Sequence, residues 1–231
     1  DRVAFDGADS VTIVLAAATD FDRDPAKNGR GAPPASVVTA RLAHVAATPF
    51  ATLLSEHVAD HRQLFERVQL DLGTTPTATL PTPARLAALQ QGKADPALAT
   101  LLFNYGRYLL IASSRPGGLP ANLQGLWNVE MKPAWFSGYT TNINIEMNYW
   151  LAEPTALPEC HEPLFDWVEA LAAVQKKSSD PLLQTPVGWI IYSTNNPFGG
   201  NTAWAIHRPG SAWLAQHFWE RYAFSGDRAF L

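Results

Sequence analysis

The stretch DPALATLLFNYGRYLLIASSR, residues 95–115, carries apolar side chains around most of the circumference of one predicted helix. Asp95 can serve as the N-cap, and Pro96 stands at the first helical position, where a missing N–H costs nothing. A helix that is apolar on most sides is usually buried. We therefore predict a mainly α-helical fold in which this helix packs among several others.

Further helices are predicted on both sides of this stretch, because apolar residues recur there at helical spacing. Pro49 interrupts the pattern upstream, and Gly226 follows the last helix as a C-cap. The predicted helices cover residues 36–67, 145–153, 161–178 and 210–224. Residues 20–34 and 73–84 are rich in turn-forming and proline residues, which is typical of linkers.

Residues 3–18 alternate in character and are rich in β-branched side chains, a pattern that predicts a β-strand. No second strand of comparable strength follows nearby. We therefore expect the partners of this strand to lie in sequence outside this chain, and we expect the natural N-terminus to be missing.

The composition excludes several classes of function. The chain has 231 residues, 47% of them hydrophobic, which suffices for a packed core, and its net charge is −4. No basic field is present to hold nucleic acid, and no apolar run approaches the roughly 20 residues needed to cross a membrane. No export signal is visible either. We predict neither a nucleic-acid nor a membrane partner.

The single cysteine and the histidines give no pattern of a metal centre. Cys160 is expected to be a small buried apolar residue. His57 and His61 are one helical turn apart, but a third ligand at a convincing spacing is lacking, so a solvated helix face is preferred. We predict no metal and no organic cofactor.

Two long loops, residues 113–144 and 193–209, are the strongest candidates for function, because loops of this length in a compact domain are usually functional. They combine amide side chains with tryptophans, as sugar sites do, since sugars present both hydroxyl groups and apolar C–H faces. Taken alone, each tryptophan could be a core residue and each asparagine a turn-forming residue. Their joint density in two loops favours a carbohydrate site. The candidate substrate-binding residues from this composition are Asn122, Gln124, Trp127, Asn128, Trp135 and Trp204.

Asn142 and Asn144 are candidates for a direct role in chemistry. Two residues apart on a helix or strand, their side chains would diverge, so they can converge only in irregular backbone, such as a turn into the helix beginning near Ile145. A carboxamide oxygen can accept a hydrogen bond from water and aim it, but the amide cannot take the proton. A carboxylate base and a second carboxyl group must act with the pair.

The carboxylates of the chain show no obvious pair. Glu220 lies among apolar residues that could raise its pKa, yet a structural role beside an arginine is the more common outcome. The candidates are Glu130, Glu146, Glu153, Glu162, Glu220 and Asp227. The residues alone therefore indicate a glycan-handling surface with an incomplete acid and base set.

Four segments resemble the α-L-fucosidases of glycoside hydrolase family 95. They are LLFNYGRYLLIASSRPGGLPANLQGLWN (101–128), YTTNINIEMNYWLAE (139–153), ECHEPLFDWV (159–168) and SAWLAQHFWERYAFSGDRAFL (211–231). These segments are long and specific, and the resemblance extends from about residue 95 to the last residue.

The resemblance implies a domain order. Residues 1–20 would be the end of an N-terminal β-sandwich, residues 21–94 a linker region with helices, and residues 95–231 the N-terminal part of a catalytic (α/α)6 barrel. Family members release terminal α-1,2-linked L-fucose from glycans with inversion, and some prefer α-L-galactosides. The family's water-holding asparagines fall on Asn142 and Asn144 here. Residues 193–213 resemble the family members that carry a Phe-Gly-Gly element in this loop, and the resemblance makes Trp204 and His207 candidate sugar contacts.

The chain departs from the family pattern in one respect, because it contains no Ser-Pro-Glu segment to carry the general acid and stops before the expected base. We therefore expect an interior fragment that is inactive and poorly soluble without the rest of the polypeptide or a complementing fragment. The expected partner is a fucosylated glycan, and the expected location is secreted or periplasmic, where such glycans are met.

Three other functions stay open from the sequence. The chain could be part of a noncatalytic fucosyl-glycan-binding module, of an α-L-galactosidase of the same family, or of an unrelated helical toroid such as a cyclase or lyase.

Overall fold

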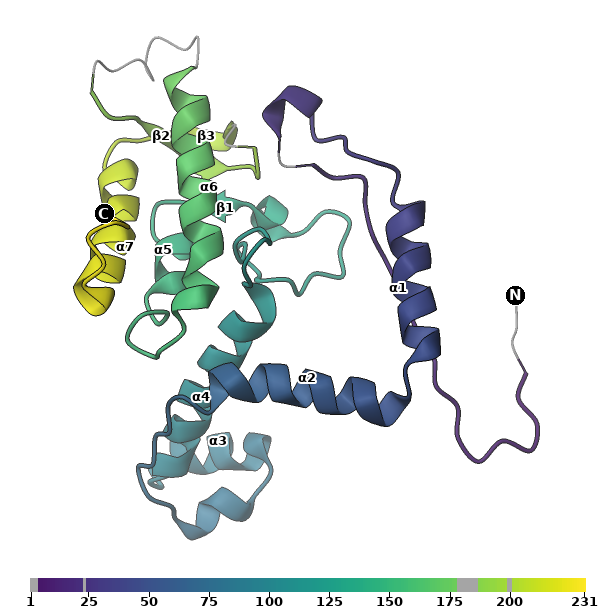
Figure 1. Ribbon diagram of the computed structural model, residues 1–231. Helices are drawn as coiled ribbons and strands as arrows, with labels where there is room; N and C mark the ends of the chain where they lie inside the picture. The colour runs from purple at the N-terminus through teal and green to yellow at the C-terminus, as the bar shows by residue number, and fades with distance from the viewer. Residues whose placement is uncertain (1–3, 23, 178–186, 199–200) are drawn as a thin grey trace. The chain divides into compact units, whose positions relative to one another are not determined.

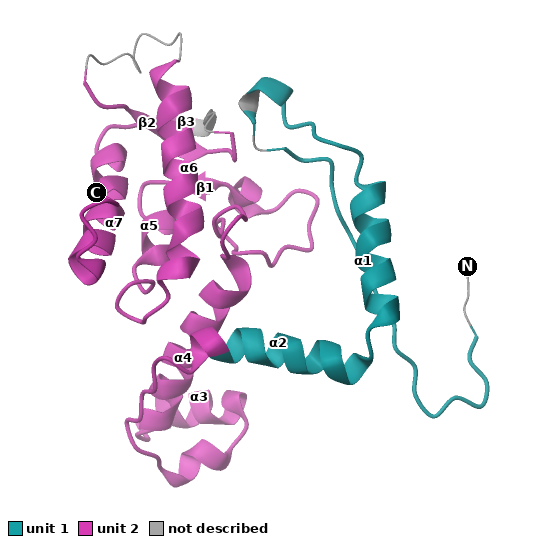
Figure 2. Ribbon diagram, in the orientation of Figure 1, with its two compact units in different colours: residues 1–62 teal, residues 63–231 magenta. Residues whose placement is uncertain are grey.

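The computed structural model describes residues 4–22, 24–177, 187–198 and 201–231 (Figure 1). The chain divides into two compact units, residues 1–62 and residues 63–231 (Figure 2). The mainly α-helical class predicted from the sequence is confirmed, with one small antiparallel sheet in the second unit. The arrangement of the helices as part of a barrel stays a prediction.

The first unit contains the short 3-10 helix η1 (Pro25–Lys27), helix α1 (Ala35–Ala47) and most of α2 (Phe50–Phe65). Before α1, a loop closes on itself through ion pairs of Asp20 with Arg30 and of Asp22 with Lys27, at 2.7 and 2.8 Å. The break between the two helices falls at Thr48 and Pro49, as the proline predicted.

The strand predicted over residues 3–18 does not form in the part of it that the structure describes, residues 4–18. Ile13 and Leu15 are 84% and 91% exposed, and the segment is attached to α1 by a hydrogen bond from Arg41 Nη1 to the Ala17 carbonyl. A strand needs a neighbouring strand to bond its backbone groups, and none of the described residues supplies one. The β-rich pattern is therefore present without the β-structure.

The second unit begins with an apolar helix pair. The 3-10 helix η2 (Pro76–Thr79) leads to α3 (Thr82–Gln90), and α4 (Pro96–Ser113) follows. Asp95 caps α4 by accepting a hydrogen bond from the Leu98 N–H at 3.1 Å, and Arg85 of α3 binds the same carboxylate with two bonds of 2.8 and 2.9 Å. The cap predicted at Asp95 is confirmed, and the ion pair joins the two helices.

Helix α4 is buried only over its last turns, at Arg107, Leu110, Ile111 and Ser113. Its first half exposes apolar side chains, such as Leu102 at 71% and Tyr105 at 54%, beside an apolar cavity of about 680 Å³ shared with α3. The prediction of a helix buried throughout was wrong for this half, which borders an open apolar cavity and is not covered by a packed neighbour among the described residues.

The core of the second unit gathers around α6 (Pro158–Lys176), with α5 (Asn144–Tyr149), α7 (Gly210–Ser225) and the sheet beside it (Figure 1). The strands are β1 (Tyr139–Thr140), β2 (Ile191–Asn195) and β3 (Asn201–His207), antiparallel in that order. The most buried apolar side chains include Ile145, Tyr149, Leu157, Cys160, Leu164, Leu171, Ile191 and Leu214. The buried position predicted for Cys160 is confirmed.

The predicted helices of this unit match the observed ones within a few residues, although α5 ends at Tyr149 and not at 153. Gly226, at φ 69°, ends α7 and donates to the Tyr222 carbonyl, which confirms the C-cap. Helix α3 was not predicted as a separate helix: its first residues fall in the linker predicted over residues 73–84, within the region 21–94 expected to contain helices. Strands β2 and β3, which overlap the predicted loop at residues 193–209, were missed. Residues 178, 199 and 200 of the predicted elements lie outside the described residues.

Among the described residues, no single helix is both long and apolar enough to cross a membrane. The bent pair α1 and α2, at 111° to each other, meets the criterion of length and composition when the two helices are taken together.

Candidate active site

The segment before the asparagine pair is fixed to the sheet. Strand β1 pairs with β2, and the next residue, Thr141, donates its backbone N–H to the Ser193 carbonyl at 2.9 Å and its hydroxyl to the Tyr192 carbonyl at 2.7 Å. Asn195 donates from Nδ2 to the same hydroxyl at 3.2 Å. The backbone is therefore held firmly up to the residue that precedes Asn142.

Asn142 and Asn144 line one pocket of about 340 Å³, together with Leu123, Trp135, Thr140 and Trp204. Between the two asparagines, Ile143 has φ 163° and ψ −37°, which is neither helical nor strand-like, and α5 begins at Asn144. The two side chains thus reach the same pocket across irregular backbone, as their two-residue spacing required. No hydrogen bond engages either carboxamide within the described residues, so both can serve a water or a ligand.

Two tryptophans form the apolar part of this pocket. The rings of Trp135 and Trp204 meet edge to face, with centroids 5.3 Å apart and planes at 68°, and they are 62% and 49% exposed. Both residues have positive φ, 56° and 73°. Residues other than glycine adopt a positive φ at an energetic cost, and such backbone strain is concentrated at functional sites. The exposed rings can stack on the C–H face of a sugar.

Asn122 and Gln124, predicted to bind substrate, do not line this pocket but support it. Both carboxamide oxygens lie within hydrogen-bonding distance of the Ser137 hydroxyl, at 3.1 and 2.7 Å, and the Asn122 oxygen also accepts the Gln124 N–H at 2.9 Å. Asn148 of α5 donates to the Asn122 carbonyl at 3.1 Å. These bonds hold the loop beside α5, and within the described part of the chain they do not engage the amide NH₂ groups of the two side chains.

Trp127, Asn128 and His207 are likewise absent from the described lining. The Trp127 ring lies over Gly125, where an added Cβ would come within 2.7 Å of it. The Asn128 side chain accepts from the N–H of Glu130 and donates to its carbonyl, both at 2.9 Å, as a turn former does. His207 ends β3 and packs against Gly210. Their binding roles stay predictions.

Glu146 is the carboxylate nearest in sequence to the pair. It is 0% exposed, and neither side-chain oxygen reaches hydrogen-bond geometry with any described group. Burial raises the pKa of Glu146 to about 7, against a smaller opposing effect of the Glu146 and Ile143 backbone N–H groups. The sequence identified this residue only as one of six carboxylates, because burial cannot be read from its position alone.

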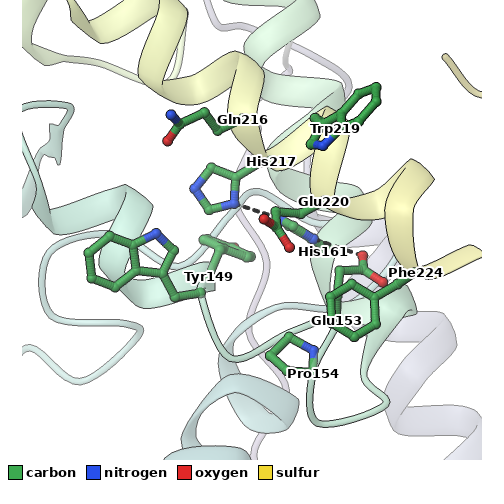
Figure 3. Close-up of a pocket in the computed structure, with 10 residues that line it drawn as sticks. Tyr149, Glu153, Pro154, His161, Gln216, His217, Trp219, Glu220 and Phe224 are labelled. Carbon is green, nitrogen blue, oxygen red and sulfur yellow. Dashed lines mark hydrogen bonds and ion pairs between the residues drawn. The ribbon is translucent and has the colours of Figure 1, made fainter.

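A second pocket, of about 500 Å³, lies between α5, α6 and α7 and contains a buried polar chain that the sequence did not reveal (Figure 3). Glu153 Oε1 lies 2.9 Å from His161 Nδ1, and His161 Nε2 lies 2.9 Å from His217 Nδ1. Arg221 reaches the same Glu153 oxygen at 3.4 Å. Glu220, expected to be structural, is exposed at the edge of this pocket.

The described residues contain no group of three His, Cys, Asp or Glu side chains arranged to hold a metal ion. The first pocket is lined by the amide side chains of Asn142 and Asn144, the rings of Trp135 and Trp204, and Leu123 and Thr140.

Comparison with known proteins agrees with the resemblance of the four sequence segments. Residues 49–231 match the glycosyl hydrolase family 95 catalytic domain. The chain is 36% identical to "Alpha-L-fucosidase 2" of Arabidopsis thaliana, over 100% of this chain and 28% of that protein. It is 35% identical to "Probable alpha-fucosidase A" of Aspergillus niger, over 97% of this chain and 30% of that protein. The chain thus spans less than a third of the length of these relatives. All four segments fall within the matched region, and the chain belongs to glycosyl hydrolase family 95.

Proposed function

We propose that the full-length protein containing this chain is an α-L-fucosidase that removes terminal α-1,2-linked L-fucose from glycans by inverting water attack. The observation that carries the proposal is the convergence of Asn142 and Asn144 on one pocket beside the Trp135 and Trp204 rings. The names of the relatives support the fucoside as substrate. Because such glycans are met outside the cytoplasm, the proposal includes a secreted or periplasmic location.

In this mechanism the two carboxamide oxygens accept hydrogen bonds from one water and direct its lone pair at the anomeric carbon of the fucose. The water oxygen forms a bond to that carbon as the glycosidic bond breaks. A carboxylate base takes the water proton, and a carboxylic acid protonates the leaving oxygen. In an inverting enzyme the two carboxyl groups stand roughly 6.5–9.5 Å apart to admit the water.

The six described residues that line the pocket include no carboxylate. We propose that both catalytic carboxyl groups come from other parts of the full-length protein, and that the 231-residue chain alone releases no fucose. Measurable fucose release by the purified chain, without a complementing fragment, would contradict this part of the proposal.

The water-positioning role is tested by Asn142→Ala and Asn144→Ala in the full-length protein, assayed on an α-1,2-fucosylated oligosaccharide. Each substitution should lower kcat by about 100-fold or more and leave KM within a few-fold, because the amides act on the attacking water. Asn104→Ala, on α4 and outside the pocket, is the matched control. Wild-type rates in both pocket variants, with the same thermal unfolding, would rule out the role.

The same protein preparations separate the other functions. A noncatalytic module would retain the glycan without releasing fucose. An α-L-galactosidase would cleave the matching α-L-galactoside with the higher kcat/KM.

A further inference from the structure

Asn195 of β2 is fully buried, and its side chain is anchored through its amide NH₂ group. Its Nδ2 lies 2.9 Å from the Tyr192 carbonyl oxygen and 3.2 Å from the Thr141 hydroxyl oxygen. The carboxamide oxygen is buried as well, without a hydrogen-bond partner among the described residues. A buried polar atom in this state costs free energy, so the presence of an amide here calls for a specific reason.

The side chains of Thr141 and Asn195 and the carbonyl of Tyr192 form a closed cluster of three hydrogen bonds. A carbonyl only accepts, so both the Asn195 NH₂ group and the Thr141 hydroxyl, at 2.7 Å, donate to Tyr192. The Thr141 oxygen retains a lone pair and accepts the second hydrogen of the Asn195 amide. Asn195 therefore fixes the direction in which the Thr141 hydroxyl points.

This cluster lies where β2 departs from regular pairing. The register between β2 and β3 shifts between Tyr192 and Thr194 and again between Thr194 and Asn195. In a regular strand residues three positions apart are separated by about 10 Å, so the Asn195 amide could not reach the Tyr192 carbonyl. Irregularities of this kind are frequent beside active sites, where they change the direction of a side chain.

The cluster acts next to the pocket of Asn142 and Asn144 and not in it. Thr141 and Asn195 do not line that pocket, and both are 0% exposed, so neither can contact a water or a sugar there. Thr141 is nevertheless joined to Asn142 by one peptide bond, and the Ser193 carbonyl accepts its N–H at 2.9 Å. These backbone and side-chain bonds together set the direction in which the chain leaves the sheet toward Asn142.

We propose that Asn195 is a positioning residue, which holds the Thr141 hydroxyl on the Tyr192 carbonyl and so fixes the backbone from which Asn142 reaches the attacking water. This inference rests on the proposed function. The far end of the irregular segment is held separately, because α5 is anchored in the core from Ile145 onward. The cluster secures the end that the core does not hold.

The test uses the full-length protein with an α-1,2-fucosylated oligosaccharide as substrate. Asn195→Leu removes the amide at a similar side-chain size, and Thr141→Val removes the hydroxyl at the same shape. Each should lower kcat about 10-fold or more and leave KM within about threefold, because a displacement of about 1 Å can cost up to about 100-fold in rate. Thr141→Ser keeps the hydroxyl and should retain kcat within about threefold.

Thr155→Val is the matched control for a lost buried hydroxyl. Thr155 is also buried and donates its hydroxyl to a backbone carbonyl, that of Leu151, at 2.7 Å, but it lies outside both the pocket and the cluster. Thr155→Val should lower the unfolding temperature about as much as Thr141→Val does and should keep wild-type kcat. A role in stability alone would make the two variants alike in kcat.

Several outcomes would overturn the proposal. Wild-type kcat in either Asn195→Leu or Thr141→Val would do so, as would a Thr141→Ser variant as slow as Thr141→Val. An equal loss of kcat in Thr155→Val would assign the effect to general destabilisation. If Asn195→Leu does not unfold cooperatively, Asn195→Ala replaces it with the same expectation. Failure of both to fold would assign Asn195 to stability alone and also overturn the proposal.

A double-mutant cycle separates this inference from the proposed function. In an Asn142→Ala background, Asn195→Leu should cause no further loss of kcat, since the group that it positions is gone. A further loss of about 10-fold, equal to that in the wild-type background, would overturn the inference. If Asn142→Ala keeps wild-type kcat, the proposed function itself fails. If it loses activity and Asn195→Leu does not, only the inference fails.

Discussion

His161 lies between Glu153 and His217, with His161 Nε2 2.9 Å from His217 Nδ1 and both imidazole rings at most 3% exposed (Figure 3). A carboxylate oxygen is an acceptor, so His161 Nδ1 donates to Glu153 Oε1 and, in the neutral ring, His161 Nε2 accepts from the Nδ1–H of His217. One chain of bonds thus fixes the tautomers of both histidines and joins α6 to α7. It breaks when both rings are protonated, because the two facing nitrogens then both carry hydrogens.

Acid should therefore destabilise the protein through these histidines. Burial lowers the pKa of both, for His217 to about 3, with proximity to His161 as a second cause for His217. In the unfolded chain an ordinary histidine titrates near about 6.5. Between these pKa values the unfolded state binds more protons, so the free energy of unfolding should fall as pH decreases from about 6.5 toward 3. Urea unfolding at several pH values measures this slope.

The contribution of His217 can be isolated with His217→Asn, which keeps a donor near the Nδ1 position and cannot titrate in this range. The slope below pH 6.5 should become shallower, whereas His57→Gln on the exposed face of α2 should leave it unchanged. Parallel slopes for wild type and His217→Asn would contradict the assignment.

Glu146 should affect the pH dependence of stability in the opposite sense, because burial raises its pKa to about 7. The neutral carboxyl group is the form that the fold favours, so its contribution to the free energy of unfolding is present at low pH and is lost as pH rises from about 4.5 to 7. The same urea unfolding series measures this change.

Arg107 should be a major determinant of stability. Its guanidinium is 1% exposed and donates to the carbonyls of Leu64, Phe65 and Val68 at 3.0, 2.6 and 3.3 Å, at the end of α2. Arg107→Met would leave these buried carbonyls without their donor and should lower the free energy of unfolding by about 3 kcal/mol. Arg107→Lys should recover only part of the lost stability, because a single ammonium nitrogen cannot replace the two guanidinium nitrogens that donate to these carbonyls.

The matched comparison for Arg107 is Arg67→Met. Arg67 also makes a two-pronged contact, with Glu159 at 2.8 Å for both bonds, but both side chains are partly exposed. Its loss should cost about 1 kcal/mol or less. Equal losses for the two variants in chemical denaturation would show that burial does not decide the difference.

The asparagine pair and Glu146 show how far the sequence could predict the candidate site. The two-residue spacing of Asn142 and Asn144 was sufficient to require irregular backbone, since no regular element lets such side chains converge. The burial of Glu146 was not predictable, because it depends on packing between elements far apart in sequence. Asn122 and Gln124 were predicted to bind substrate, and this stays a prediction; their hydrogen bonds with Ser137 could not be predicted, because they depend on the folded loop.

The elements of the fold also differ in how far the sequence could predict them. Helices α4, α6 and α7 follow from local periodicity, caps and a proline. Strands β1 and β2 pair through residues more than 50 positions apart, such as Thr140 and Thr194, so the local sequence pattern does not predict this pairing. Residues 4–18 have the local pattern of a strand without a partner strand, and they form none.

The tryptophan pair should contribute to substrate affinity. Trp135→Ala and Trp204→Ala should each raise KM about 5- to 30-fold, with a smaller effect on kcat, because an aromatic face removed from a sugar contact loses about 1–2 kcal/mol. Trp204→Phe should recover part of the affinity. Trp127→Ala, which removes a ring outside this pocket, should change KM less than either. A KM effect of Trp127→Ala that equals theirs would restore the binding role predicted for Trp127 from the sequence.

Gly138 should control the placement of the asparagine pair through the sheet. A Cβ added there would lie 2.9 Å from Thr194 Cγ2, and Thr194 is fully buried in β2, so its methyl group cannot move aside easily. Gly138→Ala should push β1 away from β2, shift the segment that leads to Asn142, and lower kcat by about 10-fold. It should also cost about 1–3 kcal/mol of stability from overpacking.

Gly106→Ala is the control, because no atom outside the neighbouring helix backbone lies within 4 Å of its added Cβ. That variant should keep kcat and gain up to about 1 kcal/mol, since alanine favours the helix interior. If Gly138→Ala keeps wild-type kcat while losing stability, the asparagine pair is held independently of β1, and the core around α5 must position it without the sheet.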